Sequence, residues 1–229
     1  RRVLLLRLGD VQRDFLGSLA QATATFEQVL REWPADPTAL RALAGLYSSP
    51  GMPGAAPERA AEQRRVLSAL LGVTTDPAER SRLLQHMAEA DEKQGNVDEA
   101  FKNFGQAFFL DPSNRAAFTA YERLCYLRKQ WTETIRIYET ALKLIETQKT
   151  RSYRPADLHL RRGQVLLQYL QQTDEALPCY LRALESDAEN DSTQATLESI
   201  YASRNQWREL LSVYDKRASL VREDIKRVE

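Results

Sequence analysis

The stretch "GNVDEAFKNFGQAFFLDPSN" (Gly95–Asn114) contains the spacing on which the fold prediction rests. Ala100, Phe104 and Ala107 are separated by four and then three residues, so all three lie on one face of a helix. The run stops before Pro112, because proline has no N–H to donate and disfavours α geometry in the residue before it. Two small residues around an aromatic predict close contact with a second helix, with the aromatic filling the remaining space.

The same arrangement recurs along the chain. The further triplets are Ala22/Phe26/Val29, Thr134/Tyr138/Ala141, Ala176/Tyr180/Ala183 and Leu210/Tyr214/Arg217. The helices that precede the triplets also repeat: Arg7–Ala22 matches Arg161–Ala176, and Leu43 and Tyr47 match Leu197 and Tyr201 at that same offset of 154 residues. Independent landmarks that agree on one offset indicate internal repeats.

The chain therefore divides into six helical hairpins that alternate in type. Their approximate ranges are 1–34, 37–72, 77–111, 113–147, 155–188 and 190–224. We expect an all-α fold in which 1–229 forms a single domain, since one isolated hairpin cannot bury enough apolar surface. The chain starts without methionine and stops within a helical pattern, so we expect a piece of a longer protein.

Composition excludes several classes of protein. The 32 basic and 32 acidic residues cancel, which argues against a nucleic-acid binder that must neutralise phosphates. The opening run "VLLLRL" is broken by arginine after four residues, too early to span a bilayer. Cys125 and Cys179 suit a reducing compartment, where they behave as small buried hydrophobes. We expect a cytoplasmic protein, with the periplasm as the alternative.

No catalytic motif is visible. The chain has no GxSxG elbow, no glycine-rich phosphate loop and no Cys-x-x-Cys, and "HMAEADE" lacks the second histidine of HExxH. His86 and His159 stand far apart in the sequence, without a second ligand at metal spacing. Each is open to two interpretations, a metal ligand or a histidine on the surface or in a groove. We expect neither an enzyme nor a cofactor.

The third hairpin resembles the tetratricopeptide repeat. The residues at the motif positions are Leu84, Ala88, Gly95, Ala100, Phe104, Ala107 and Pro112. The fourth hairpin departs from the pattern, with Glu122 where a small residue is usual, and the second has "SSPGMPGAAP" in place of a tight turn. The alternating double unit is similar to the very large repeat proteins of myxobacteria, some of which are linked to cell polarity and motility through Ras-like GTPases.

The resemblance implies a right-handed α-solenoid of about six antiparallel hairpins, in which the first helix of each hairpin lines a concave surface. It implies a non-catalytic scaffold that binds a peptide, a helix or a small folded partner there, such as a Ras-like GTPase. The alternative is an architectural spacer or self-association segment. The inward positions are Arg82, Gln85, Glu89, Lys93, Thr119, Arg123, Tyr126, Leu160, Gln164 and Ser199.

Three further features each have two interpretations. Trp131 and Trp207 occupy equivalent positions in the repeats. They are interpreted either as residues that pack between hairpins or as anchors of an interface with a partner. The loop Ser48–Pro57 is a flexible connection or a binding loop with Met52 at its tip. The basic segment Thr147–Arg162 is a solvated linker or a patch for an acidic partner.

Overall fold

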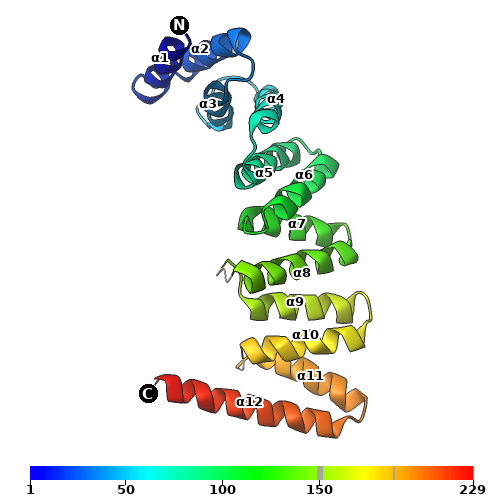
Figure 1. The fold of residues 1–229 in the computed structure, drawn as a ribbon. Coiled ribbons are helices and arrows are strands. Elements are labelled where there is room, and N and C mark those ends of the chain that lie inside the picture. The colour runs from blue at the N-terminus through cyan, green and yellow to red at the C-terminus, as the bar shows by residue number, and fades with distance from the viewer. Residues whose placement is uncertain (149–151, 188, 229) are drawn as a thin grey trace. The chain divides into compact units, whose positions relative to one another are not determined.

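The computed structural model describes residues 1–148, 152–187 and 189–228. Across these ranges the chain forms twelve α-helices and no strand, which confirms the predicted all-α helical-repeat fold (Figure 1). In pairs, the helices are α1 (Arg2–Asp14) and α2 (Leu19–Glu32), α3 (Pro37–Ser48) and α4 (Ala56–Val73), α5 (Pro77–Lys93) and α6 (Val97–Leu110), α7 (Arg115–Leu127) and α8 (Trp131–Gln148), α9 (Pro155–Gln168) and α10 (Thr173–Ser186), α11 (Asp191–Ser203) and α12 (Trp207–Val228). Residues 149–151 of the basic segment and residue 188 of the fifth hairpin lie outside the described residues.

Contacts divide the chain into two compact units, Arg1–Tyr121 and Glu122–Glu229. The first unit contains α1 to α6 and the beginning of α7; the second contains the rest of α7 and α8 to α12. The single domain over 1–229, the right-handed coiling and the continuous concave face stay predictions.

Short polar residues determine where several first helices begin. The Asp36 carboxylate accepts hydrogen bonds from the backbone N–H groups of Thr38 and Ala39 at 3.0 Å, and Asp76 accepts one from Glu79 at 2.8 Å. Each aspartate is followed by a proline at the first helical position, where a missing N–H costs nothing. Asp36-Pro37 and Asp76-Pro77 therefore begin helices, whereas Asp111-Pro112 follows the end of α6.

Tight turns separate the helices of five hairpins. Each turn has one residue in the left-handed region, namely Gly17, Gly95, Lys129, Gln171 or Asn205. Left-handed geometry ends a helix abruptly and frees the chain to reverse direction. The second hairpin differs, because residues 49–55 form a longer connection between α3 and α4.

The small-and-aromatic triplets form the seams within the helix pairs. In the first four triplets along the chain the aromatic residue and its two neighbours are buried, with Phe26, Phe104, Tyr138 and Tyr180 almost inaccessible. In the first and fifth pairs, a glycine of the first helix lies against the ring. A Cβ added at Gly9 would lie 2.6 Å from Phe26, and one at Gly163 would lie 3.1 Å from Tyr180, so a larger residue would crowd the ring. In α12, by contrast, Tyr214 is exposed.

A buried ionic group joins three helices of the first unit. The Asp91 side chain of α5 is inaccessible, and its carboxylate lies 2.8 Å from Arg64 Nη1 of α4. Asn103 of α6 donates a second hydrogen bond to it at 2.9 Å. Burial is the main cause that raises the pKa of Asp91, and the Arg64 charge opposes that shift.

His159 gives the second unit a pH-dependent stability. Burial lowers its pKa, and the Arg182 and Arg162 charges lower it further against Glu146 and Glu185. Below about pH 6.5 this histidine therefore binds a proton more readily in the unfolded chain than in the folded one, so the stability decreases as the pH is lowered, by at most about 1.4 kcal/mol per pH unit from this group. We expect His159→Leu to reduce the loss of unfolding free energy between pH 7.5 and pH 5.5, measured by urea titration. An unchanged difference between the two pH values would assign that loss to other groups.

Candidate functional site

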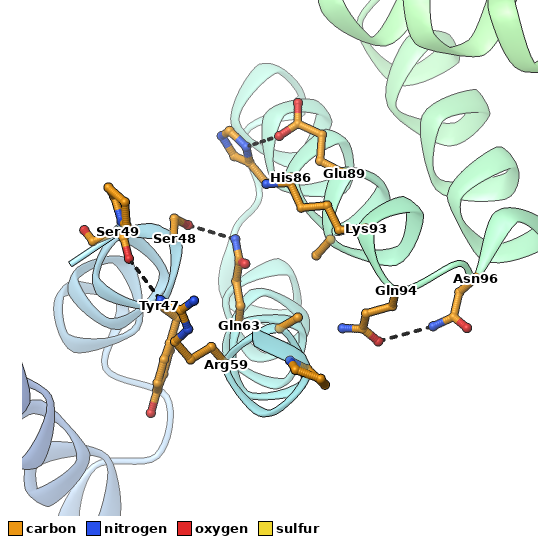
Figure 2. A pocket seen from close by; sticks show the side chains of 14 residues that line it. Tyr47, Ser48, Ser49, Arg59, Gln63, His86, Glu89, Lys93, Gln94 and Asn96 are labelled. Carbon is orange, nitrogen blue, oxygen red and sulfur yellow. Dashed lines mark hydrogen bonds and ion pairs between the residues drawn. The ribbon is translucent and has the colours of Figure 1, made fainter. Parts of the chain in front are cut away.

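The first unit contains an open cavity of about 720 Å³ between α3, α4 and α5 (Figure 2). The end of α3, the beginning of α4 and the second half of α5 line it. The lining residues are Tyr47, Ser48, Ser49, Pro50, Pro57, Arg59, Ala60, Gln63, His86, Glu89, Ala90, Lys93, Gln94 and Asn96. Its volume lies within the range of about 300–1,000 Å³ that is typical of ligand pockets.

A smaller cavity of about 230 Å³ continues the first along the same helices and shares Ser48, Gln63 and His86 with it. It extends over Gly45 of α3 and reaches the Arg41–Glu79 ion pair, in which Arg41 Nη2 lies 2.8 Å from the carboxylate. Leucines supply its apolar floor: Leu67, Leu70 and Leu83. We call the two cavities together the α3–α5 groove.

The α5 side of the groove is a charged rim. His86 Nδ1 lies 3.3 Å from the Glu89 carboxylate, and Gln85 Nε2 donates to that carboxylate at 2.8 Å. The hydrogen bond with His86 is the largest cause that lowers the pKa of Glu89, while the Lys93 charge acts in the same direction. The rim therefore presents a fixed anion beside an exposed cation.

The other side of the groove is formed by the connection between α3 and α4. Arg59 Nη1 donates to the carbonyl of Met52 at 2.8 Å and to that of Ser49 at 3.5 Å. Gln63 Nε2 donates to Ser48 Oγ at 2.8 Å. These bonds tie the connection to α4, so it serves as a wall of the groove.

The structure brings part of the predicted α5 set into the groove. Glu89 and Lys93 line it, Gln85 supports Glu89, and Arg82 is exposed outside the lining. His86 contributes to the rim, in agreement with its interpretation as a groove residue.

The wall residues Ser48, Arg59 and Gln63 were not among the predicted contacts. The signal that could have found them was the unusual length of the connection after α3. Met52 is absent from the lining and its sulfur lies 3.6 Å from the Thr23 hydroxyl of α2, and its role at the tip of a binding loop stays a prediction.

The remaining predicted residues lie elsewhere in the two units. Thr119 is exposed in the first unit, where its hydroxyl donates to the Arg115 carbonyl at 2.9 Å. In the second unit Arg123 and Ser199 are exposed, and Leu160 packs against the core. Gln164 and Tyr126 are partly buried. Their role in binding stays a prediction.

Glu122 explains a departure of the fourth hairpin from the repeat pattern. Its carboxylate accepts a hydrogen bond from Tyr138 of α8 at 2.5 Å, and both of its oxygens lie 3.0 Å from Arg161 Nη1 of α9. The Tyr126 hydroxyl lies 3.3 Å from that of Tyr138. A charged residue is accommodated at a usually small position because neighbouring helices supply its partners.

Trp131 belongs to an aromatic cluster at one end of α7, α8 and α9. Its ring stacks on Tyr169 with centroids 3.8 Å apart and an interplanar angle of 11°. The Tyr126 ring meets Trp131 edge-on at 5.4 Å. Trp131 therefore packs against the following helix, whereas Trp207 in α12 is exposed.

Potential metal ligands and thiols are dispersed or buried among the described residues. Within them, no three His, Cys, Asp or Glu side chains are grouped so as to hold a metal ion. Cys125 and Cys179 are buried, and burial raises the pKa of the Cys125 thiol to about 12. None of the described helices combines the length and the apolar composition needed to cross a membrane.

The paired helices define an all-α helical-repeat protein, with the α3–α5 groove between its second and third pairs. Tetratricopeptide-repeat profiles match residues 4–36, 156–190 and 195–227. These three segments of the chain are therefore tetratricopeptide repeats.

Several solved structures are similar to this chain. The MamA protein is 16% identical with a TM-score of 0.50, over 83% of this chain and 94% of that chain. YrrB, titled a TPR protein with an unusual peptide-binding site, is 13% identical with a TM-score of 0.48, over 86% of this chain and 91% of its own. A repeat protein from Parabacteroides merdae is 16% identical with a TM-score of 0.45, over 96% of this chain and 78% of its own. At these identities the similarity concerns the fold alone. No curated protein matches the sequence.

Proposed function

We propose that the protein is a non-catalytic scaffold that binds a segment of another protein in the α3–α5 groove. The observation that carries this proposal is a groove with an apolar floor between two polar walls. Apolar side chains of a peptide would lie against Pro50, Pro57 and Ala60, which line the groove and remain accessible, while its polar groups would meet Ser48 and Gln63. Such a combination of apolar burial and a few placed polar groups is what ligand pockets use for affinity and orientation.

The charges on the rim restrict the partner. Glu89 and Lys93 are one helical turn apart on α5, and His86 lies beside Glu89. A partner with a basic and an acidic side chain at matching distances would satisfy both charges, whereas a uniformly charged one would be repelled by one of them. The proposed occupant is therefore a peptide with apolar anchors and charges of both signs.

Two finer expectations rest only on the resemblance to the large repeat proteins of myxobacteria. They are a Ras-like GTPase as the folded partner and a role in cell polarity or motility. A cytoplasmic location is a separate expectation, which rests on Cys125 and Cys179 as residues suited to a reducing compartment.

Filling the groove is expected to abolish binding without affecting the fold. Gly45 lies on the groove, and a Cβ added there meets nothing within 4 Å. We expect Gly45→Phe to weaken binding of a peptide selected from a random display library on the wild-type chain by roughly tenfold or more, which is at least about 1.4 kcal/mol. Fluorescence anisotropy with the labelled peptide measures the change.

Gly72 provides the matched control, because it is also a helical glycine with nothing within 4 Å of an added Cβ, and it lies outside the groove. Gly72→Phe should bind the peptide like the wild type. Equal affinities for Gly45→Phe and Gly72→Phe, with circular dichroism unchanged in both, would remove the groove as the binding site.

A further inference from the structure

The smaller cavity of the α3–α5 groove has an equivalent place in the second unit, because the chain repeats internally. Equivalent residues are 154 apart between the second and sixth hairpins and 76 apart between the fourth and sixth, so α7 corresponds to α3 at an offset of 78. Ala44 then matches Glu122, and Ser48 matches Tyr126. Buried residues match one another at this offset: Ala39/Ala117, Leu40/Phe118 and Leu46/Leu124.

The neighbouring helices correspond at an offset of 75. α4 and α8 are each 18 residues long, and their first residues are separated by that number. Gln63 of α4 then matches Tyr138 of α8, and His86 of α5 matches Arg161 of α9. Along α5 and α9 the offset again joins buried residues: Ser81/Ala156, Leu83/Leu158 and Ala88/Gly163.

In the second unit this place is occupied by an acidic side chain of the chain itself. Glu122 extends from α7 to α9, where both of its carboxylate oxygens lie 3.0 Å from Arg161 Nη1. It also accepts the hydrogen bond from Tyr138, whose hydroxyl lies 3.3 Å from that of Tyr126. The Glu122 side chain is only 12% exposed, so the helices around it hold a nearly buried carboxylate.

The first unit has a cavity among the corresponding residues. Ala44 ends in a methyl group where Glu122 carries its carboxylate, and it lines the cavity of about 230 Å³. The counterparts of the residues around Glu122, namely Ser48, Gln63 and His86, line the same cavity. Gln63 Nε2 donates to Ser48 Oγ at 2.8 Å, so these two side chains meet as the two tyrosine hydroxyls of the second unit do (Figure 2).

The charges of the lining suit an anion. Three basic side chains, Arg41, Arg59 and Lys93, line the groove with two acidic ones, Glu79 and Glu89. The two carboxylates already have partners, since Glu79 pairs with Arg41 while Gln85 and His86 contact Glu89 (Figure 2). A protonated His86 that holds Glu89 through Nδ1 can donate from Nε2 to a second carboxylate.

We propose that the smaller cavity receives an acidic side chain of the peptide partner, whose carboxylate takes the place that Glu122 has in the second unit. It lies against Ala44, pairs with His86 and accepts a hydrogen bond from Gln63. This inference rests on the proposed function and adds which side chain of the peptide enters which part of the groove. The partner is therefore recognised at one acidic residue beside its apolar anchors.

The first test is a double-mutant cycle between peptide and protein. The probe is an acidic peptide selected on the wild-type chain from a random display library and made with an amidated C-terminus, so that its end carries no carboxylate. Replacing its acidic residue by the corresponding amide should weaken binding to the wild type by about tenfold, measured by fluorescence anisotropy. On His86→Ala the same replacement should cost about threefold or less, because the paired side chain is absent.

Lys93→Ala is the matched comparison, because it removes the other basic side chain that α5 contributes to the groove. On this variant the amide replacement should still cost about tenfold. A cost that disappears in Lys93→Ala and persists in His86→Ala overturns the inference. So does a selection whose groove-binding peptides contain no acidic residue. In both cases Gly45→Phe still blocks binding and the proposed function stands, whereas a peptide that ignores Gly45→Phe removes both.

The second test supplies the carboxylate from the chain itself. Ala44→Glu should weaken binding of the acidic peptide by about tenfold or more and abolish its advantage over the amide form, because the new side chain occupies the cavity. Ala69→Glu is the control, since Ala69 is an exposed alanine of α4 outside the lining, and it should bind like the wild type. With helicity by circular dichroism unchanged, an Ala44→Glu chain that keeps the tenfold preference overturns the inference.

The geometry is also tested without a peptide. Ala44→Glu combined with His86→Arg reproduces the residues of the Glu122–Arg161 pair. We expect the urea midpoint of the double variant to exceed the value that the two single changes predict by addition. Strictly additive midpoints would show that the two positions do not face each other as their counterparts do, and would overturn the inference.

Discussion

Replacing Phe104 with alanine is expected to lower the free energy of unfolding of the first unit by about 3–5 kcal/mol. The ring is almost completely buried in α6, with Ala100 and Ala107 inaccessible on the same face. Those two alanines have no side-chain length with which to fill the space that the ring leaves. The substitution therefore loses the transfer free energy of the ring and also leaves a cavity.

Urea titration followed by far-UV circular dichroism measures this loss, with the transitions of the two units fitted separately. Leu110→Ala on the same helix is the control, because Leu110 is exposed and its truncation should cost less than about 1 kcal/mol. If Phe104→Ala costs no more than Leu110→Ala, the aromatic residue does not hold the seam between the helices.

Replacing Arg64 with methionine is expected to cost about 3–5 kcal/mol at pH 7, because it leaves the inaccessible Asp91 carboxylate with Asn103 as its remaining partner. The pH dependence follows from the sign of the Asp91 shift. Burial already raises its pKa, and removing the Arg64 charge takes away the largest cause that lowers it. The penalty is therefore present above the folded pKa and is relieved as the carboxyl group protonates at lower pH.

The loss caused by Arg64→Met should accordingly be smaller at pH 4 than at pH 7, each measured against the wild type at the same pH. Adding Asp91→Asn should recover part of the loss at pH 7, since the buried group is then neutral. An equal loss at both pH values would mean that Arg64 acts through the packing of its side-chain stem.

Much of the fold could be predicted because its signals are local. The spacing of Ala100, Phe104 and Ala107 is a property of one helix, and Pro112 and Gly95 mark its ends. Each repeat contacts mainly its neighbours in the chain, so local patterns carry most of the architecture. The match between Arg7–Ala22 and Arg161–Ala176 also indicated that α1 and α9 are equivalent helices. It could not show which side chains of each helix are exposed.

The candidate site could be predicted only in part. Family spacing placed Glu89 and Lys93 on the lining, but it also selected Arg82, which lies outside it, and omitted the wall formed by Ser48 and Gln63. The direction of a helical face follows from the period of 3.6 residues, whereas the opening between α3 and α5 depends on how the α3–α4 connection folds back on Arg59.

The sequence by itself determined the helices, their order in pairs and the residues that pack within each pair, since these follow from the helical period and from helix-ending residues. Only the tertiary structure decided which polar side chains meet. Glu122 pairs with Arg161 and Asp91 pairs with Arg64, while Met52 contacts α2 and does not line the groove. These contacts join residues distant in the sequence, and their distances depend on the packing of several helices at once, which no local pattern records.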